Sequence, residues 1–263
     1  MDLSETSSTR QKTPWGASLF SGFTIGVTEA LVNHPLWVLK TRFQAGWPFT
    51  LRPAVLYRGI ITHMVSSVPV DTIALGAARA INERALPENM SPTAKRIIAG
   101  FFGGILAGFA GSTCEMAMTW QQKEKSFSRA VRMIVQSGGP AHLMTGSIAL
   151  SLREGVFWVG TYSATNLIEH NLRARGKGKL FSTFVAGLSS GVVCSFISQP
   201  FDNIKLVMQI SPRRCSLIKT IGEMAKKEGH AAFFRGYNLR VLRVALAVMI
   251  EGALNNECER RFF

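Results

Sequence analysis

Long uncharged stretches alternate along this chain with stretches that carry isolated charges. Residues 180–201 form a run of 22 without a charged side chain, and residues 97–114 form a run of 18. A helix needs about 20 mostly apolar residues to cross the core of a bilayer. The pattern therefore predicts membrane-spanning helices in at least these two places.

Other apolar stretches of similar length contain single ionisable residues. These residues are Glu29, Asp71, Arg153, Glu154, Arg243 and Glu251. Ionisable groups are costly at membrane depth, and they usually face a bundle interior or a wet cavity. Spans interrupted in this way indicate an all-helical membrane protein with a polar interior.

Polar positions recur at fixed spacing, which indicates internal repeats. The first and third copies share a proline, a lysine five residues later and a glutamine nine residues later: Pro35, Lys40, Gln44 and Pro200, Lys205, Gln209. Two glycines precede each proline by thirteen and nine residues: Gly22, Gly26 and Gly187, Gly191. Glycines spaced Gly-x-x-x-Gly allow helix backbones to approach closely inside a membrane.

A weaker middle copy becomes visible when the same spacing is applied from Gly100 and Gly104. It has Thr113 in place of the proline. The positions two, five and nine residues later are Glu115, Met118 and Gln122. The polar N-terminal residues 1–14 are followed by three predicted repeats, at 15–90, 91–177 and 178–263.

A second short motif follows each copy and opens another apolar segment. Its three versions are Tyr57-Arg58-Gly59, Met144-Thr145-Gly146 and Phe234-Arg235-Gly236. Amphipathic stretches precede it in the second and third copies, whereas the first copy has only a short segment with two prolines. We therefore expect surface helices in repeats 2 and 3 and a tight loop in repeat 1. The six predicted helical spans are 15–45, 59–85, 93–124, 146–171, 180–210 and 237–260.

Composition and motifs narrow the function classes. Charged residues make up 17% of the chain and the net charge is +14. No nucleic-acid recognition signature accompanies that charge, so a basic membrane protein facing anionic lipid fits better than a nucleic-acid binder. The four cysteines form no Cys-x-x-Cys pair. The sequence contains no metalloprotease, hydrolase or phosphate-loop motif, so we predict no enzyme, no cofactor and no metal site.

The threefold pattern Pro-x-acid-x-x-base-x-base-x-Gln, followed by aromatic-base-Gly, resembles the signature of the mitochondrial carrier family. The resemblance covers nearly all of the chain after Pro14, with the third copy matching best and the second worst. It implies six tilted helices around a pseudo-threefold axis, one central site, and residence in the mitochondrial inner membrane. Matrix-side surface helices belong to the same family pattern.

The resemblance also implies a gate on the matrix side, made by acid–base pairs between odd-numbered helices. Two pairs are expected, Glu115 with Lys205 and Asp202 with Lys40. The third pair of positions holds Trp37 and Met118, which have lost acid and base together and are expected to pack. Random decay would more often leave one buried charge unpaired, at a cost of about 3–5 kcal/mol. The family places hydrogen-bonding braces at Gln44, Gln122 and Gln209.

The opposite, cytoplasmic gate matches the family poorly. Only Arg79 and Glu169 offer an ion pair there, with reversed polarity. This mismatch puts ordinary alternating access in doubt and is one reason to weigh a second function below.

Positions seven residues past each loop glycine are expected at equal depth around the axis. They are Ser66, Arg153 and Arg243. Arg153 is followed by Glu154, and such a pair resembles family members that carry amino acids or their derivatives. A guanidinium binds a carboxylate and a glutamate binds an ammonium group. Alternatively, the pair neutralises itself and only maintains a polar cavity.

Two function classes remain. The first is a carrier for a small amino-acid-like, zwitterionic or anionic metabolite. The second is a transport-inactive carrier-like subunit, or lipid-binding element, of a larger inner-membrane complex. Family members bind cardiolipin at the starts of the even-numbered helices, which predicts lipid contacts in this chain at Arg58, Gly59, Gly146, Arg235 and Gly236.

Overall fold

A computed structural model describes residues 15–124, 126–160, 164–212 and 214–262, and every regular element within these ranges is helical. The all-helical prediction is therefore confirmed. We use the term ring helices for α1 (Trp15–Gln44), α3 (Ile60–Ala80), α4 (Pro92–Glu124), α6 (Ser147–Val159), α8 (Lys179–Ile210) and α10 (Tyr237–Phe262).

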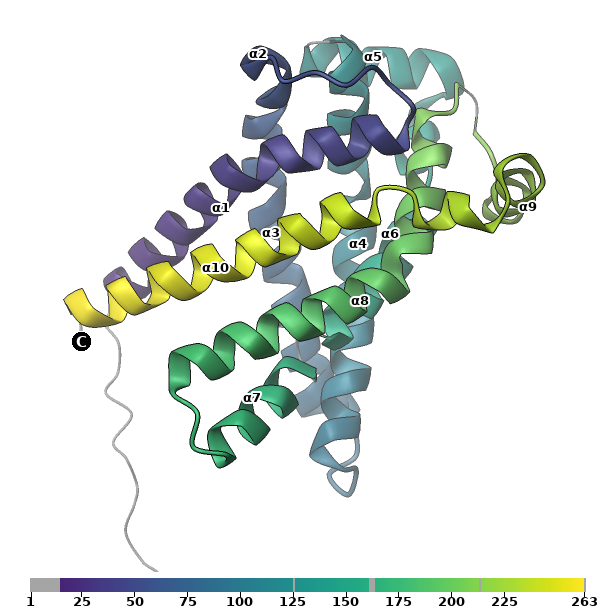
Figure 1. The fold of residues 1–263 in the computed structure, drawn as a ribbon. Helices are drawn as coiled ribbons and strands as arrows, with labels where there is room; N and C mark the ends of the chain where they lie inside the picture. Colours follow the sequence, from purple (N-terminus) through teal and green to yellow (C-terminus); the bar gives the residue numbers. More distant parts are fainter. Residues whose placement is uncertain (1–14, 125, 161–163, 213, 263) are drawn as a thin grey trace, which may run out of the picture.

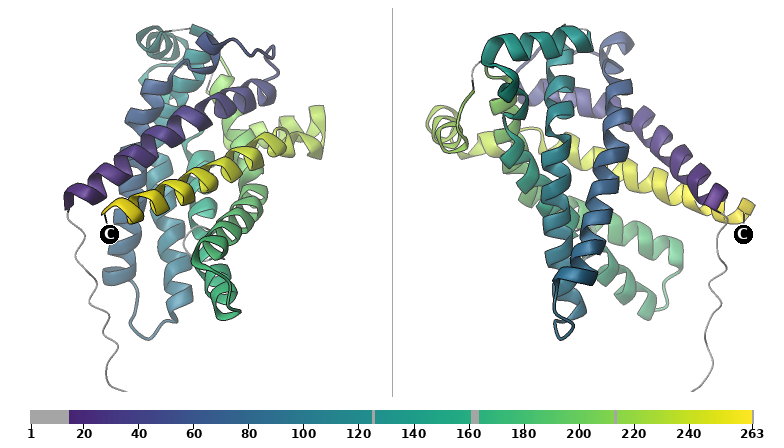
Figure 2. Two further views of the ribbon diagram at one scale, coloured as in Figure 1. Left: turned by 60° about the vertical axis from the view of Figure 1, so that its left-hand side comes forward. Right: turned by 180° about the vertical axis from the view of Figure 1, so that it is seen from behind.

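The ring helices contact one another in chain order, and α10 closes the circle by lying along α1. Figure 1 shows α1 and α10 side by side at the front, with α3, α4 and α6 behind them. The two turned views in Figure 2 show the same neighbours. Residues from opposite ends of the chain therefore share one interior.

The predicted spans agree with the observed helices to within a few residues at most ends, with two differences. Residues 81–85 continue α3 as the π-helical turn η1 (Ile81–Ala85). The span predicted as one helix at 146–171 is divided into α6 and α7 (Thr165–Ala174), with residues 161–163 outside the described structure. The helix α7 packs against α8.

Short helices lie outside the ring. They are α5 (Phe127–Gly138) and α9 (Leu217–Glu228), and each follows a serine at its N-cap. In α5, Ala130 and Ile134 pack against Met116 and Trp120 of α4. In α9, Met224 packs against α8 and α6. In repeat 1 the corresponding segment has only the four-residue α2 (Pro53–Leu56), because prolines interrupt it.

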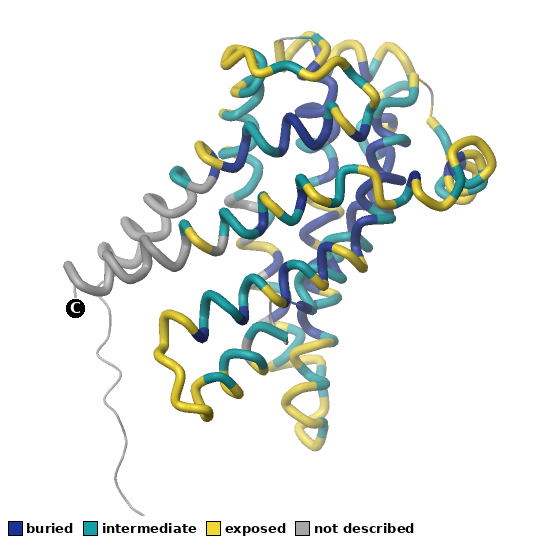
Figure 3. Tube along the Cα trace, viewed as in Figure 1, coloured by how far each residue is buried: buried dark blue, intermediate teal, exposed yellow. Residues whose placement is uncertain are grey.

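Burial follows the ring. Figure 3 shows buried backbone gathered along α4 and the C-terminal halves of α1 and α8, while loops and surface helices are exposed. By length and composition, three helical stretches of the described residues suffice to cross a membrane: Pro53–Ala85, Pro92–Glu124 and Lys179–Ile210. Large apolar side chains such as Phe102, Phe109 and Val193 face outward on these stretches.

Glycines on α4 set its distance from both neighbours. A Cβ on Gly103 would lie 2.7 Å from the carbonyl oxygen of Ala74 on α3. A Cβ on Gly104 would lie 2.6 Å from the carbonyl oxygen of Glu154, and one on Gly108 would lie 2.7 Å from the Cα of Ser151. These contacts involve backbone atoms, which cannot turn away as a side chain can. Small residues are therefore required where α4 meets α3 and α6.

We predict that Gly104→Ala lowers stability, because its methyl group would push α4 away from α6. Overpacking of this kind costs about 1–3 kcal/mol. The matched control is Gly222→Ala in α9, where an added Cβ meets nothing within 4 Å. That change should be neutral or slightly stabilising, since alanine is the better helix former. Melting temperatures in mild detergent compare the two variants, and equal melting temperatures would contradict the packing argument.

Candidate functional site

The C-terminal halves of α1, α4 and α8 carry a buried network of charges. The Nζ of Lys40 on α1 lies 2.7 Å from Oδ2 of Asp202 on α8. Lys205, one turn further along α8, pairs with Glu115 on α4. Both acid–base pairs expected from the resemblance therefore occur in the structure. They join α8 to two other helices across the interior of the ring.

Arg153 enters this network from α6. Its Nη1 lies 3.0 Å from Oδ1 of Asp202 and 3.4 Å from Oε1 of Glu115. Its Nη2 pairs with the neighbouring Glu154. The guanidinium thus bridges Glu115 and Asp202, a contact that the sequence does not predict. The network then balances three cations (Lys40, Lys205, Arg153) against three anions (Glu115, Asp202, Glu154).

The third pair of expected gate positions is apolar. Trp37 and Met118 belong to one buried cluster with Val38, and Leu56 of α2 packs against it. Only 4% of Trp37 and 3% of Met118 is exposed. The structure brings together the two residues that stand where the family has an acid and a base. We call this cluster, with the His34 and His63 rings that contact Trp37, the apolar corner.

Each loop glycine lies against a glutamine from the next repeat. The glycines are Gly59, Gly146 and Gly236, with φ of 86°, 83° and 77°, a left-handed conformation that favours glycine. A Cβ added to Gly59 would approach Gln121 and Gln122. One added to Gly146 would approach Gln209, and one added to Gly236 would approach Gln44. The order runs from repeat 1 to repeat 2, from 2 to 3, and from 3 back to 1.

The three predicted braces make different hydrogen bonds. Gln44 donates to Oδ2 of Asp202 at 3.0 Å. Gln122 donates to the carbonyl of Arg58, and the side chain of Gln209 accepts from Thr119. Among the three glutamines, only Gln44 therefore bonds to a carboxylate of the ion network within the described residues. The others connect the gate helices to a loop or to each other.

Two further predicted site residues lie near the gate. The hydroxyl of Ser66 donates to the carbonyl of His63 and approaches Sδ of Met118 at 3.8 Å. Arg243 on α10 is close enough to act electrostatically on Lys40 and on His63. Ser66 thus borders the apolar corner, while Arg153 and Glu154 lie in the ion network.

Sequence reasoning missed Arg240, a buried cation on α10. Its Nη2 donates to the hydroxyl of Ser198 at 2.7 Å, and its Nη1 to the side chain of Gln199 at 3.4 Å. Arg240 lies four residues past its loop glycine, as His63 does in repeat 1. This shared offset from the loop glycine is the sequence feature that could have predicted a buried polar residue at position 240.

The predicted cytoplasmic pair lies only partly within the described structure. The side chain of Arg79 is outside it. Glu169 pairs with Arg173 in the next turn of α7 and accepts a hydrogen bond of 2.9 Å from Thr183 on α8. Glu169 therefore already has partners on α7 and α8.

Comparison with known proteins addresses the family directly. A family model described as mitochondrial carrier protein matches residues 176–263. The chain is 27% identical to the mitochondrial glycine transporter of Mus musculus, over 99% of this chain and 88% of that protein. It is 23% identical to mitochondrial citrate transporter B of Aspergillus niger, over 88% of each chain.

The chain is thus similar to mitochondrial carriers over most of its length, and its C-terminal third matches the model of that family. A third relative, the probable mitochondrial 2-oxodicarboxylate carrier of Schizosaccharomyces pombe, is 24% identical over 88% of this chain and 89% of its own length. These matches, together with helices long and apolar enough to cross a membrane, support a membrane transporter of small metabolites in the mitochondrial inner membrane.

We predict that Trp37→Asp destabilises the protein by about 3–5 kcal/mol, because it places an unpaired charge in the apolar corner. Adding Met118→Lys should recover much of the loss by supplying the missing base. Melting temperatures in detergent measure both effects. The control Trp37→Phe keeps an apolar ring and should cost less than Trp37→Asp. A double variant no more stable than Trp37→Asp would rule out direct pairing at these positions.

Proposed function

We propose that all six ring helices cross the inner membrane as three two-helix repeats, and that the protein moves its solute by alternating access. The cyclic order of glycine and glutamine contacts supports this arrangement, because each repeat touches the next in the same way. The ion pairs between α1, α4 and α8 close one end of the ring. In this proposal they form the matrix gate.

The solute site lies beside that gate, and Arg153 belongs to both. Its guanidinium is shared between Glu115, Asp202 and Glu154. A solute carboxylate that binds Arg153 would draw it away from the two gate acids. The closed gate would then lose two of its charge contacts at the moment of binding. This single observation, a site residue bonded to the gate acids, carries the proposal of a transporter rather than an inert subunit.

The charges favour a small solute with at least one carboxylate. Arg153 and Arg243 can bind anionic groups, Glu154 can bind an ammonium group, and Ser66 adds a hydroxyl. The named solutes of the three relatives, glycine, citrate and 2-oxodicarboxylates, all carry a carboxylate. Glu154 beside Arg153 favours an α-amino acid head group over a polyanion. We therefore propose an amino-acid-like, zwitterionic or anionic metabolite.

Uptake into liposomes should separate the two halves of this head-group site. Arg153→Lys keeps the positive charge but loses the forked contact, so it should reduce uptake of every carboxylate solute by roughly 10- to 100-fold. Glu154→Gln should reduce uptake of glycine by a similar factor and leave citrate and 2-oxodicarboxylate uptake unchanged or raised. The measurement is the initial rate with each labelled solute.

Arg132→Lys, on the exposed side of α5, is the matched control and should transport like the unaltered chain. Equal loss of all solutes in Glu154→Gln would remove the amino-acid assignment. An unaltered chain that moves none of the solutes, and that purifies with a large inner-membrane complex, would instead favour the structural subunit.

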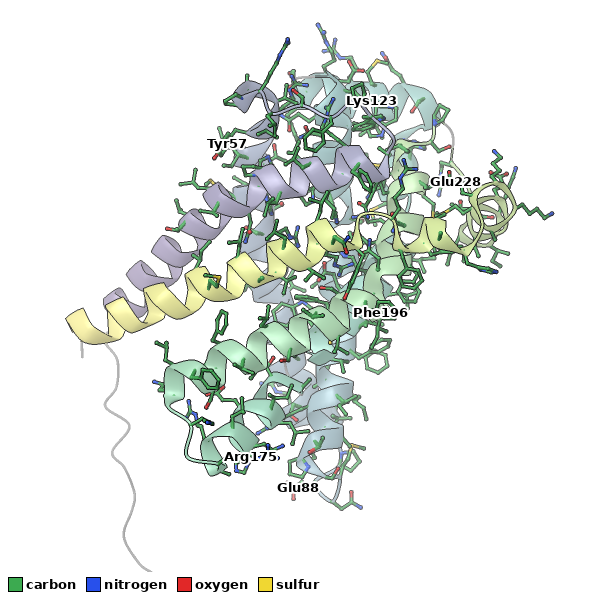
Figure 4. All side chains as sticks on the ribbon, in the orientation of Figure 1. Tyr57, Glu88, Lys123, Arg175, Phe196 and Glu228 are labelled. Atoms are coloured by element: carbon green, nitrogen blue, oxygen red, sulfur yellow. The ribbon has the colours of Figure 1, made fainter. Side chains whose placement is uncertain are left out.

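We also propose that lipid headgroups bind where α3, α6 and α10 begin. Arg235 is exposed and lies 5.6 Å from the ring of Phe43, and the Phe196 ring (labelled in Figure 4) stacks on Phe234 at 4.9 Å. An apolar groove of about 510 Å³ next to Gly236 is lined by these aromatic rings. It offers room for acyl chains beside a cation. In repeat 2, Gly146 is buried and Thr145 replaces the arginine, so that site should be the weakest.

Added cardiolipin should raise the melting temperature of the purified protein. The reason is that a ligand which binds only the folded state stabilises it. Arg235→Gln should remove more of this rise than Thr145→Val, because only the first change deletes a charge from an exposed site. Melting curves with and without cardiolipin provide the test. Equal shifts in both variants would argue against headgroup binding at the start of α10.

A further inference from the structure

Two histidines on neighbouring helices form a direct ring-to-ring hydrogen bond. The Nδ1 of His34 on α1 lies 3.0 Å from the Nδ1 of His63 on α3. The Nε2 of His34 lies 3.0 Å from the carbonyl oxygen of Arg58. His34 is fully buried and His63 is partly buried. Neither residue takes part in the gate pairs or in the solute site described above.

The hydrogen bonds assign the protons of this pair. A carbonyl only accepts, so Nε2 of His34 carries hydrogen, and a neutral His34 then offers a lone pair at Nδ1. His63 must donate from its own Nδ1, which leaves its Nε2 as the basic nitrogen. The pair can therefore take up one proton, at Nε2 of His63, and keep the bond between the rings. A second proton, on Nδ1 of His34, would break that bond.

The pair belongs to the apolar corner of the gate. The ring of Trp37 stacks on His34 with centroids 5.6 Å apart and lies 6.2 Å from the ring of His63. Met118 and Leu56 complete the surroundings of Trp37. Ser66, one turn beyond His63 on α3, touches Met118. Separation of α1 from α3 and α4 would expose the histidines to water together with Trp37.

The charges around the pair disfavour an added proton while the corner is closed. Arg243 of α10 repels positive charge on both histidines, and Glu115 of α4 attracts it on His63. Glu115 is already bonded to Lys205 and Arg153. The guanidinium of Arg58, in the loop before α3, is turned to the carbonyl of Gln122. A buried imidazolium would thus have a cation beside it and only a shared carboxylate to balance it, which is unfavourable.

We propose that the His34–His63 pair is a proton-binding site that opens the apolar corner of the gate when it takes up a proton. This inference rests on the gate proposed above and adds the proton as a second ligand of the carrier. The closed state holds the pair neutral, whereas the opened state exposes it to water, where an imidazolium is well solvated. Acid therefore favours opening, and alkali favours closure. The linkage is one proton per opening event.

Accessibility of a cysteine at position 66 tests this directly. In Ser66→Cys protein, N-ethylmaleimide labelling at residue 66 is followed by peptide mass spectrometry between pH 8 and pH 5. Rates are divided by those of the unfolded protein at each pH, which removes the pH dependence of thiol reactivity. The normalised rate should rise by about tenfold per pH unit over the range in which one proton binds. A rate that does not change with pH would overturn the proposal.

His63→Asn supplies the decisive comparison. Its amide can still donate to Nδ1 of His34 but cannot take up a proton, so the normalised rate should stay low at every pH. An acid-induced rise equal to that of the parent would assign the effect elsewhere. If this variant does not fold, Arg243→Gln serves instead: without that cation, the rise should begin at higher pH. If the pH midpoint of labelling in Arg243→Gln equals that of the parent, the result would also contradict proton binding by the histidine pair.

His142 supplies the matched histidine control. It lies outside the ring helices in the loop before α6, where burial lowers its pKa. Acid protonation of His142 therefore favours unfolding and loosens the protein as pH falls below the usual imidazole range. His142→Gln should nevertheless keep the pH-dependent labelling at residue 66; loss of that dependence would contradict the assignment. Labelling needs no solute, so its outcome is independent of whether the liposome assay finds transport.

Discussion

Burial of ionised side chains inside a ring of apolar helices is the constraint on which this structure depends. Asp202 is completely buried and lies among Lys40, Lys205 and Arg153. A buried carboxylate without partners would be strongly destabilising, and breaking one buried pair typically costs about 3–5 kcal/mol. Since the partners come from α1, α6 and α8, the charges hold three helices that are far apart in the sequence close together in the ring.

Close backbone packing makes this arrangement possible. The glycines of α4 bring the backbones of α3 and α6 into contact with it. Because α4 and α6 lie so close, the side chain of Arg153 on α6 can reach Glu115 on α4. The loop glycines let Gln44, Gln122 and Gln209 approach the starts of the next helices. Small residues therefore determine which charged side chains can meet. Polar contacts then fix the helices in that order.

The three corners of the proposed gate differ in chemistry although their positions in the sequence are related. Two corners are closed by ion pairs, and the third by Trp37 and Met118 with the histidine rings of His34 and His63 beside them. Ion pairs and apolar contacts respond differently to a solute. A carboxylate competes for Arg153, but it has no charge to attack at the apolar corner. That asymmetry is the physical reason to look for a second ligand, and an imidazole pair is suited to a proton.

The sequence by itself determined the helices and the spacing of the repeated motifs, because apolar stretches and motif offsets can be read along the chain. The two ion pairs were expected from the resemblance of those motifs to a known family. This resemblance also identified Trp37 with Met118, since a paired loss of charge preserves an interface. Only the tertiary structure decided that Arg153 bonds to the gate acids and that His34 meets His63. Those contacts depend on how closely neighbouring helices approach and on which rotamers the shared interior allows. The spacing of residues along one helix determines neither the distance between helices nor the rotamers of their side chains.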